Sequence, residues 1–160
     1  MSPFSRVTAA VLLAFALSAG SAVADDRSVV EAFYAQLLSA PAPDDLDGQV
    51  RDVVAEDWVS IPTPRGGEGA EGLVKTLKFF YSIIPDLKWT PQEILQVGNR
   101  YVVRSTATGT PTGKFFGIEP KAGFEIMTID IHEVVDGRIV RSYHVEDWAR
   151  AIRQVSGSGH

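Results

Sequence analysis

Four long runs of extended character follow one another in the second half of this chain, and they restrict its fold more than any other feature. The runs span Leu87–Val97, Arg100–Thr110, Phe124–Val135 and Arg138–Val145. Turn signals, Gly98-Asn99 and Asp136-Gly137, separate the members of each pair, as is typical of antiparallel hairpins. The sequence therefore predicts an antiparallel meander whose two hairpins are joined by the loop Pro111–Gly123.

Helical patterns precede most of these strands. Apolar side chains at helical spacing predict helices over Ser28–Ala40, over Leu46–Ala55 with Asp44 or Asp45 as its cap, and from Leu73 to Ile84. A short strand is expected over Asp57–Ile61, and a last helix after Asp147. Helices followed by a meander favour an α+β fold, in which a curved antiparallel or mixed sheet is covered on one face by the N-terminal helices. Such a sheet makes a cone with a cavity.

The first residues, Met1–Ala24, have the plan of a secretory signal peptide. Arg6 precedes the mostly apolar run Val7–Leu17, and small residues lead to Ala24. The run is too short to cross roughly 30 Å of hydrocarbon, and the chain has no cysteine for lipid attachment. We expect a mature protein that is periplasmic or secreted, with no membrane association. Residues 25–155 would form one domain, and residues 156–160 a disordered tail.

Composition excludes several classes of function. The formal net charge is -5, and the 15 Lys and Arg residues are scattered, which argues against a nucleic-acid partner. Without cysteine, disulfides, thiolate chemistry and sulfur-based metal sites are excluded. The histidines, at positions 132, 144 and 160, do not have the HxxxH or HxH spacing of a zinc site. We expect no metal and no cofactor.

Five local strings, in this order along the chain, carry a family resemblance. They are Ile84-Pro85-Asp86-Leu87, the Arg104 strand running into Gly109-Thr110, Gly113-x-Phe115-x-Gly117, Ile129-Asp130-Ile131 and Val135-Asp136-Gly137-Arg138-Ile139. Over essentially the whole mature chain, the sequence resembles the SnoaL-like branch, or ester cyclases, of the nuclear transport factor two-like superfamily. It departs from the family at Pro111, where many relatives carry a histidine after Gly-Thr.

The resemblance implies a cone-shaped α+β barrel, a possible homodimer, and an intramolecular aldol step on a polyketide without metal or cofactor. In these cyclases the acid–base pair is a histidine in the penultimate long strand and an aspartate in the last. Those positions correspond here to Asp130 and His144, so the two residue types are exchanged. We expect His144 to act as acid and base and Asp130 to orient it.

Whether Asp130 faces His144 depends on the turn between their strands. A three-residue loop ending at Arg138 would set the two opposite each other, whereas a strict two-residue loop would pair Asp130 with Tyr143. The two faces of Phe124–Val135 are similarly apolar, so only the resemblance places Asp130 inside. His132 would then also face inward, and a histidine in such a position is more often structural than catalytic.

Other residues are candidates for contacts with a ligand. Arg104 would line the pocket or lie buried with Asp130 or Glu125 as partner, or else lie on the convex surface. Ser60 is a polar candidate near the reacting atoms. The remaining candidates are the possible pocket walls Trp58, Tyr81, Tyr101 and Phe116, together with Thr128 on the same strand face as Asp130.

Two functions are compatible with these residues. The first is cofactor-free cyclisation or isomerisation of a small, largely apolar carbonyl compound. The second is a periplasmic module that binds a hydrophobic metabolite without converting it. Export disfavours a polyketide substrate, because biosynthetic cyclases work beside cytoplasmic synthases.

Cleavage is predicted between Ala24 and Asp25, because small side chains occupy the −3 and −1 positions and an acidic pair starts the mature chain. Intact-mass measurement of the secreted protein tests it. A mature species that begins more than about three residues away, or that retains Met1, would contradict the prediction.

Overall fold

The computed structural model describes residues 26–158 of the chain. The expected signal peptide and its cleavage point lie outside the described residues. Within residues 26–158, no helix is both long and apolar enough to cross a membrane.

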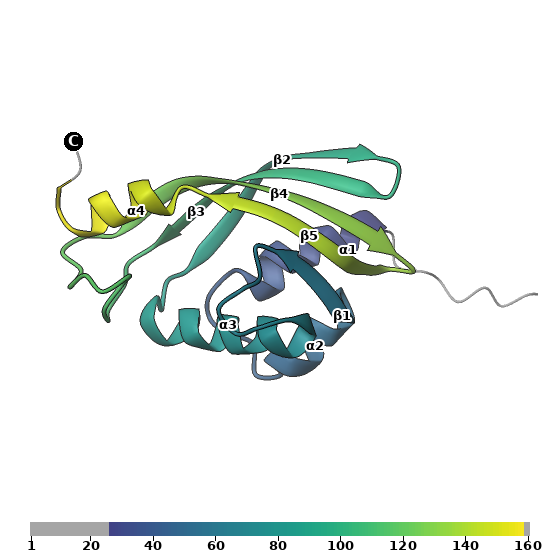
Figure 1. The fold of residues 1–160 in the computed structure, drawn as a ribbon, viewed down its shortest axis with the longest axis horizontal. Coiled ribbons are helices and arrows are strands. Elements are labelled where there is room, and N and C mark those ends of the chain that lie inside the picture. The colour runs from purple at the N-terminus through teal and green to yellow at the C-terminus, as the bar shows by residue number, and fades with distance from the viewer. Residues whose placement is uncertain (1–25, 159–160) are drawn as a thin grey trace, which may run out of the picture.

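The five strands form one curved sheet, as the sequence predicts. They are β1 (Val54–Ile61), β2 (Lys88–Val97), β3 (Arg100–Gly109), β4 (Phe124–Val135) and β5 (Arg138–Glu146). Their order across the sheet is β1-β5-β4-β3-β2. The strand β1 runs parallel to β5, and every other neighbouring pair is antiparallel. Figure 1 shows the long strands β2–β5 arching over the helices. The expected mixed α+β architecture is confirmed.

Helices cover one face of this sheet (Figure 1). They are α1 (Asp26–Ala32), the π-helical turn η1 (Phe33–Leu37), α2 (Leu46–Val53) and α3 (Gly69–Ile83), with α4 (Trp148–Val155) packed on β4. The cap of α2 is Asp45, whose side chain accepts a hydrogen bond from the Gly48 amide. The helix α2 ends earlier than expected, because Val54 and Ala55 belong to β1.

The first predicted helix differs from the structure at its end. One helix was expected over Ser28–Ala40, but α1 passes into η1, which ends at Leu37. The next residues pair with the start of β2: the Trp89 amide donates to the Leu38 carbonyl, and the Ala40 amide donates to Leu87. These hydrogen bonds satisfy backbone groups that a continued helix would have bonded internally.

The tail after α4 was expected to be disordered over residues 156–160. Ser156–Ser158 form a turn in which the Ser158 amide donates to the Arg153 carbonyl. Gly159 and His160 lie outside the described residues.

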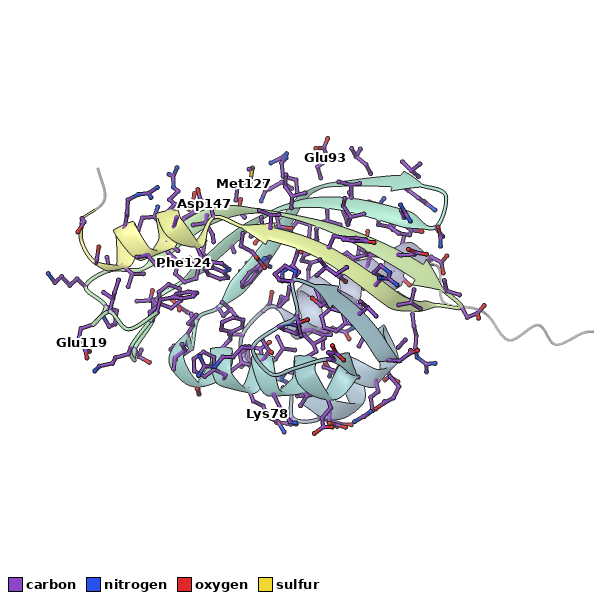
Figure 2. All side chains as sticks on the ribbon, in the orientation of Figure 1. Lys78, Glu93, Glu119, Phe124, Met127 and Asp147 are labelled. Atoms are coloured by element: carbon purple, nitrogen blue, oxygen red, sulfur yellow. The ribbon has the colours of Figure 1, made fainter. Side chains whose placement is uncertain are left out.

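Alternation along β4 separates the two faces of the sheet. The side chains on the parity of Asp130 are buried, and they are Phe124, Ile126, Thr128, Asp130, His132 and Val134. The intervening residues face outward, and Figure 2 shows Met127 and Glu93 projecting from the outer face.

An apolar row crosses all five strands on the outer face, through Leu95, Val102, Ile131, Tyr143 and Ile61. The homodimer stays a prediction.

The turn between β4 and β5 has two residues, and a bulge corrects its register. Asp136 and Gly137 both have positive φ, of 51° and 72°, as a type I′ hairpin turn requires. The turn pairs Val135 with Arg138, but the register then shifts by one residue, so that Glu133 pairs with Arg141 and Asp130 with His144. The expected pairing is therefore present, but it comes from a bulge at Val140 and not from a longer loop.

Two further features shape the surroundings of the sheet. The edge strand β2 carries Pro91, and its pairing with β3 is irregular between Pro91 and Glu93. On the other side, the loop after β1 packs tightly on α3, because a Cβ atom at Gly72 would overlap the carbonyl of Gly67. Glycine at position 72 thus keeps the loop of residues 62–68 against the helix.

Replacement of Ile126 by alanine is expected to lower the free energy of unfolding by about 2–5 kcal/mol, because it leaves a void in the core. Ile126 is 2 % exposed on the inner face of β4. Glu125→Ala, one residue earlier on the outer face, serves as the control and should change stability by less than about 0.5 kcal/mol. Urea unfolding followed by circular dichroism compares the two. Equal losses would contradict the assignment of faces.

Candidate functional site

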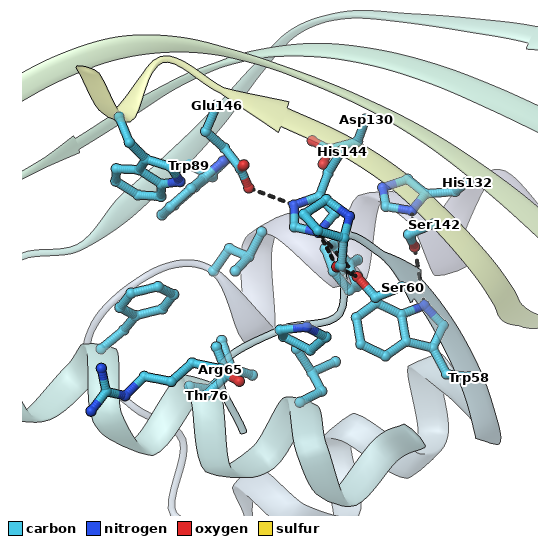
Figure 3. A pocket seen from close by; sticks show the side chains of 18 residues that line it. Trp58, Ser60, Arg65, Thr76, Trp89, Asp130, His132, Ser142, His144 and Glu146 are labelled. Atoms are coloured by element: carbon cyan, nitrogen blue, oxygen red, sulfur yellow. Dashed lines mark hydrogen bonds and ion pairs between the residues drawn. The ribbon is translucent and has the colours of Figure 1, made fainter. Parts of the chain in front are cut away.

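A cavity of about 240 Å³ lies between the inner face of the sheet and α3. Most of its wall is apolar and comes from the helices and from two tryptophans: Phe33, Leu38, Leu73, Leu77, Phe80, Trp89 and Trp148. The polar part comes mainly from the sheet: Ser60, Asp130, His132, Ser142, His144 and Glu146. Figure 3 shows these polar side chains gathered on one side of the cavity, with α3 opposite. The arrangement suits a small apolar molecule that carries a polar group at one end.

Strand pairing brings the polar side chains together. Asp130 of β4 lies opposite His144 of β5, and one step along the same face His132 lies opposite Ser142. Ser142 in turn pairs with Ser60 of the parallel strand β1. Three strands thus contribute to one polar wall, although Ser60 and His144 are far apart in the sequence.

Asp130 is almost completely buried, and its Oδ2 accepts a hydrogen bond of 2.9 Å from the Tyr34 hydroxyl of η1. Burial raises the pKa of Asp130 to about 7. The hydrogen bond from Tyr34 lowers it, while the charge of Glu146 raises it and that of His144 lowers it. Because Asp130 lines the cavity and Oδ2 is engaged, Oδ1 is the oxygen left to a ligand. A carboxylate that titrates near neutral pH in an apolar site is suited to proton transfer.

His144 is bound on both ring nitrogens, but not by Asp130. Its Nδ1 lies 2.7 Å from Glu146 Oε1, and its Nε2 lies 3.0 Å from both the Pro62 carbonyl and Ser60 Oγ. A carboxylate and a carbonyl can only accept, so this site favours the doubly protonated imidazolium. Burial lowers the pKa of His144, but the hydrogen bond and charge of Glu146 and the Pro62 carbonyl outweigh it and raise the pKa to about 9.

The expected hydrogen bond between Asp130 and His144 is therefore absent among the described side chains. The carboxylate that orients His144 is Glu146, which lies two residues further along β5, on the same face. Asp130 instead has Tyr34 as its partner. The two groups face one cavity as separate units.

A second histidine lies beside Asp130. His132 is completely buried, with Nε2 2.9 Å from the Tyr34 hydroxyl and Nδ1 2.8 Å from Ser142 Oγ. Ser142 Oγ also accepts a hydrogen bond of 3.0 Å from the Trp58 indole N–H. Burial, and secondarily the charge of His144, lowers the pKa of His132 to about 3. His132 is thus neutral at physiological pH.

Trp58 and Ser60 line the cavity, whereas five other candidates from the sequence lie elsewhere. Arg104 is on the outer face, 46 % exposed, with Glu93 at 3.6 Å, because its register position alternates outward. Phe116 is 59 % exposed in the loop before β4. Tyr81 donates its hydroxyl to the Leu37 carbonyl. Tyr101 and Thr128 are buried in the inner face of the sheet, outside the cavity lining.

Sequence reasoning missed Tyr34 and Glu146. The helical spacing of the first helix includes position 34 between Val30 and Leu37, so a buried tyrosine was detectable but its partner was not. Glu146 has the same parity along its strand as His144. Extending the predicted last strand by one residue would have placed both side chains on one face.

Charged groups at the cavity do not assemble into a metal site. Within residues 26–158, no three His, Asp or Glu side chains are placed to hold a metal ion together. Arg65, on the loop after β1, also lines the cavity, and its guanidinium lies 4.2 Å from the centre of the Phe79 ring.

Comparisons with known proteins identify the family of the chain and agree with its fold. Residues 28–155 match the family described as SnoaL-like polyketide cyclase. Among solved structures, TsrD from Streptomyces laurentii superposes with a TM-score of 0.69 at 21% identity, over 82% of this chain and 94% of that one. IdmH from Streptomyces antibioticus, described as a proposed polyketide cyclase, gives 0.68 at 24%, over 81% and 96%. A proposed polyketide cyclase from Bacillus cereus gives 0.64 at 26%, over 82% and 80%. No curated protein sequence matches the chain.

Histidine-selective NMR of the folded protein should show His144 titrating near pH 9 and His132 remaining neutral down to about pH 4. Glu146→Gln should move the pKa of His144 down, because the imidazolium loses its anionic acceptor. Glu133→Gln, on the outer face of β4, is the matched control and should leave it unchanged.

The raised pKa of His144 also predicts how its contribution to the stability of the fold depends on pH. The folded-state pKa of His144 lies above its ordinary value, so its contribution is fully present below about pH 6.5 and is lost as pH rises through about 9. A His144 pKa below 7 in the wild-type protein would contradict the imidazolium assignment.

Proposed function

Since the chain belongs to the SnoaL-like polyketide cyclase family, we propose that it catalyses a cofactor-free acid–base reaction on a small, largely apolar carbonyl compound. The reaction is an intramolecular aldol cyclisation or an isomerisation. The observation that carries the proposal is one apolar cavity of about 240 Å³ that presents both Asp130 and His144 to a ligand. Asp130 supplies a proton acceptor, and His144 supplies a positive charge.

Asp130 is the better base of the two. In its ionised form, Oδ1 accepts a proton from the carbon next to the substrate carbonyl, while Tyr34 continues to hold Oδ2. His144 cannot accept while both of its ring nitrogens carry protons. These roles reverse the ones that the sequence alone favoured.

His144 stabilises the charge that develops on the carbonyl oxygen. As the C–H bond breaks, its electron pair moves into the enolate, whose oxygen lies in a site where an imidazolium supplies positive charge without reorganisation. The adjacent Ser60 hydroxyl donates to the Pro62 carbonyl and lies 3.0 Å from His144 Nε2, so it helps to position the imidazolium.

The products follow from where the enolate carbon reacts next. In an isomerisation, the proton held by Asp130 returns to a different carbon. In an aldol cyclisation, the enolate carbon forms a C–C bond with a second carbonyl of the same molecule, whose oxygen takes up the proton. Both sequences conserve atoms and electrons and need no external oxidant or reductant.

Export is part of the proposal and rests on the leader-like residues 1–24. An exported enzyme of this kind meets compounds from outside the cytoplasm. Its substrates are then scavenged or environmental ketones and not intermediates handed over by a synthase.

Proton abstraction is measurable before the natural substrate is known. We expect the protein to accelerate hydrogen–deuterium exchange next to the carbonyl of 2-tetralone, followed by NMR in D2O with a chelator present throughout. Asp130→Asn should reduce this rate by about 10²–10⁴, because the acceptor is lost. His144→Gln should reduce it less, and Asp57→Asn, an exposed carboxylate on β1, should not change it.

The pH profile is expected to be bell-shaped. The rate rises as Asp130 ionises near pH 7 and falls as His144 loses its proton near pH 9. A rising limb near 7 alone does not identify histidine as the base, because burial raises the pKa of Asp130 into the same range. Equal exchange by wild type and Asp130→Asn, both folded, would leave a non-catalytic binding module as the better description.

A further inference from the structure

Five side chains, four of which line the cavity, form an unbroken line of hydrogen bonds. It runs from the Trp58 indole nitrogen to Ser142 Oγ (3.0 Å), to His132 Nδ1 (2.8 Å), from His132 Nε2 to the Tyr34 hydroxyl (2.9 Å), and on to Asp130 Oδ2 (2.9 Å). All five residues are more than nine-tenths buried, they come from β1, β4, β5 and η1, and the line ends at Asp130, the carboxylate proposed as base. Figure 3 shows the part of this line that lies beside the cavity, from Trp58 through Ser142 to His132.

The bond directions in this line follow from its two ends together, the Trp58 indole and an ionised Asp130 carboxylate. An indole nitrogen only donates, so Ser142 Oγ accepts there. The other hydrogen-bond partner of the Ser142 hydroxyl is His132 Nδ1. A hydroxyl oxygen can accept twice, so the Trp58 end alone leaves the direction between Ser142 and Nδ1 open.

At the other end, an ionised Asp130 only accepts, so the Tyr34 hydroxyl donates its proton to Oδ2. The Tyr34 oxygen must then accept from His132 Nε2, so the neutral ring carries its single proton on that nitrogen. Nδ1 is therefore unprotonated and accepts from the Ser142 hydroxyl, whose oxygen accepts from Trp58. The two ends agree without adjustment.

We propose that His132 is a positioning residue, held as the Nε2–H tautomer by Trp58 and Ser142, and that through Tyr34 it commits Asp130 Oδ2 as an acceptor and leaves Oδ1 as the sole site of proton transfer. This inference rests on the proposed role of Asp130 as base. It assigns to Trp58 a task beyond its place in the cavity wall.

A consequence distinguishes this line from ordinary polar packing. If Asp130 became protonated and Tyr34 turned to donate to His132, the ring would need its proton on Nδ1, and the Ser142 hydroxyl would lose its acceptor. The line therefore opposes the reorganisation that would stabilise the neutral acid. Breaking it should favour protonated Asp130.

The groups that face Asp130 from the packed elements are Tyr34 of η1, His132 of β4, and His144 and Glu146 of β5. A variant that tests the line must leave all four in place. Ser142→Ala and Trp58→Phe both do so, and each removes one hydrogen-bonding group from the far end of the line. Ser142→Thr retains the hydroxyl, and Ser82→Ala, an exposed serine on α3, is the matched control.

The first measurement needs no substrate. Nitrogen-15 NMR of histidine-labelled protein should find His132 protonated on Nε2 and bare on Nδ1, and carboxyl carbon-13 NMR should give the pKa of Asp130. In Ser142→Ala and Trp58→Phe we expect this pKa to rise by about one unit. Ser142→Thr and Ser82→Ala should keep the wild-type value.

The second measurement is the exchange of 2-tetralone against pH. In the two disrupting variants, the rising limb should move upward by the same interval when each profile is scaled to that variant's own maximum rate. A purely structural role would instead lower the rate or the thermal midpoint without moving the limb.

The two proposals fail separately. An Nδ1–H tautomer of His132, or an Asp130 pKa that is the same in all four variants, would overturn the positioning role even if the protein exchanges the ketone. The expected tautomer and pKa shifts without any exchange would uphold the line of hydrogen bonds and defeat the proposed base.

Discussion

The pairing of β4 with β5 is the constraint on which the rest of the site depends. A type I′ turn alone would pair Asp130 with Tyr143 and turn His144 to the outer face, because side chains alternate along a strand. The bulge at Val140 adds one residue and restores the pairing of Asp130 with His144. Glu146, Ser142 and the contact of Ser60 with His144 all follow from the same register.

Burial then gives each group of this wall a different protonation state. Asp130 loses its water to the apolar cavity and keeps one hydrogen-bond donor, so it ionises near neutral pH. His132 loses its water without gaining an anion, so it stays neutral. His144, less deeply buried and next to Glu146, stays charged. The three titratable side chains of this wall thus comprise a proton acceptor (Asp130), a neutral imidazole (His132) and a cation (His144).

The sequence predicted the sheet more fully than the site. The four long strands and their turns were visible because alternation and the Gly98 and Gly137 turn signals are local. The inner face of β4 needed the family resemblance, since both of its faces are apolar. The partners of Asp130 and His144 could not be foreseen from parity alone: Tyr34 comes from a helix whose rotation depends on packing, and the bulge at Val140 has no sequence signal.

Arg104 is a further residue whose position could not be settled from the sequence. A charge within a strand of Val, Ser and Thr was compatible with a buried position or with the convex surface, and the structure places it on the outer face beside Glu93 of β2. An exposed cross-strand ion pair of this length contributes little to stability. The strand composition reflected a sheet with one face on the core and not a charge inside it.

The irregular pairing at Pro91 has a consequence for contacts between copies of the folded chain. An exposed edge strand offers unpaired amides and carbonyls to any extended chain that meets it, and β2 is such an edge. Proline presents no amide hydrogen there, and the shift between Pro91 and Glu93 breaks the straight row that another strand would need. The sheet thereby resists the addition of a strand from another chain at β2.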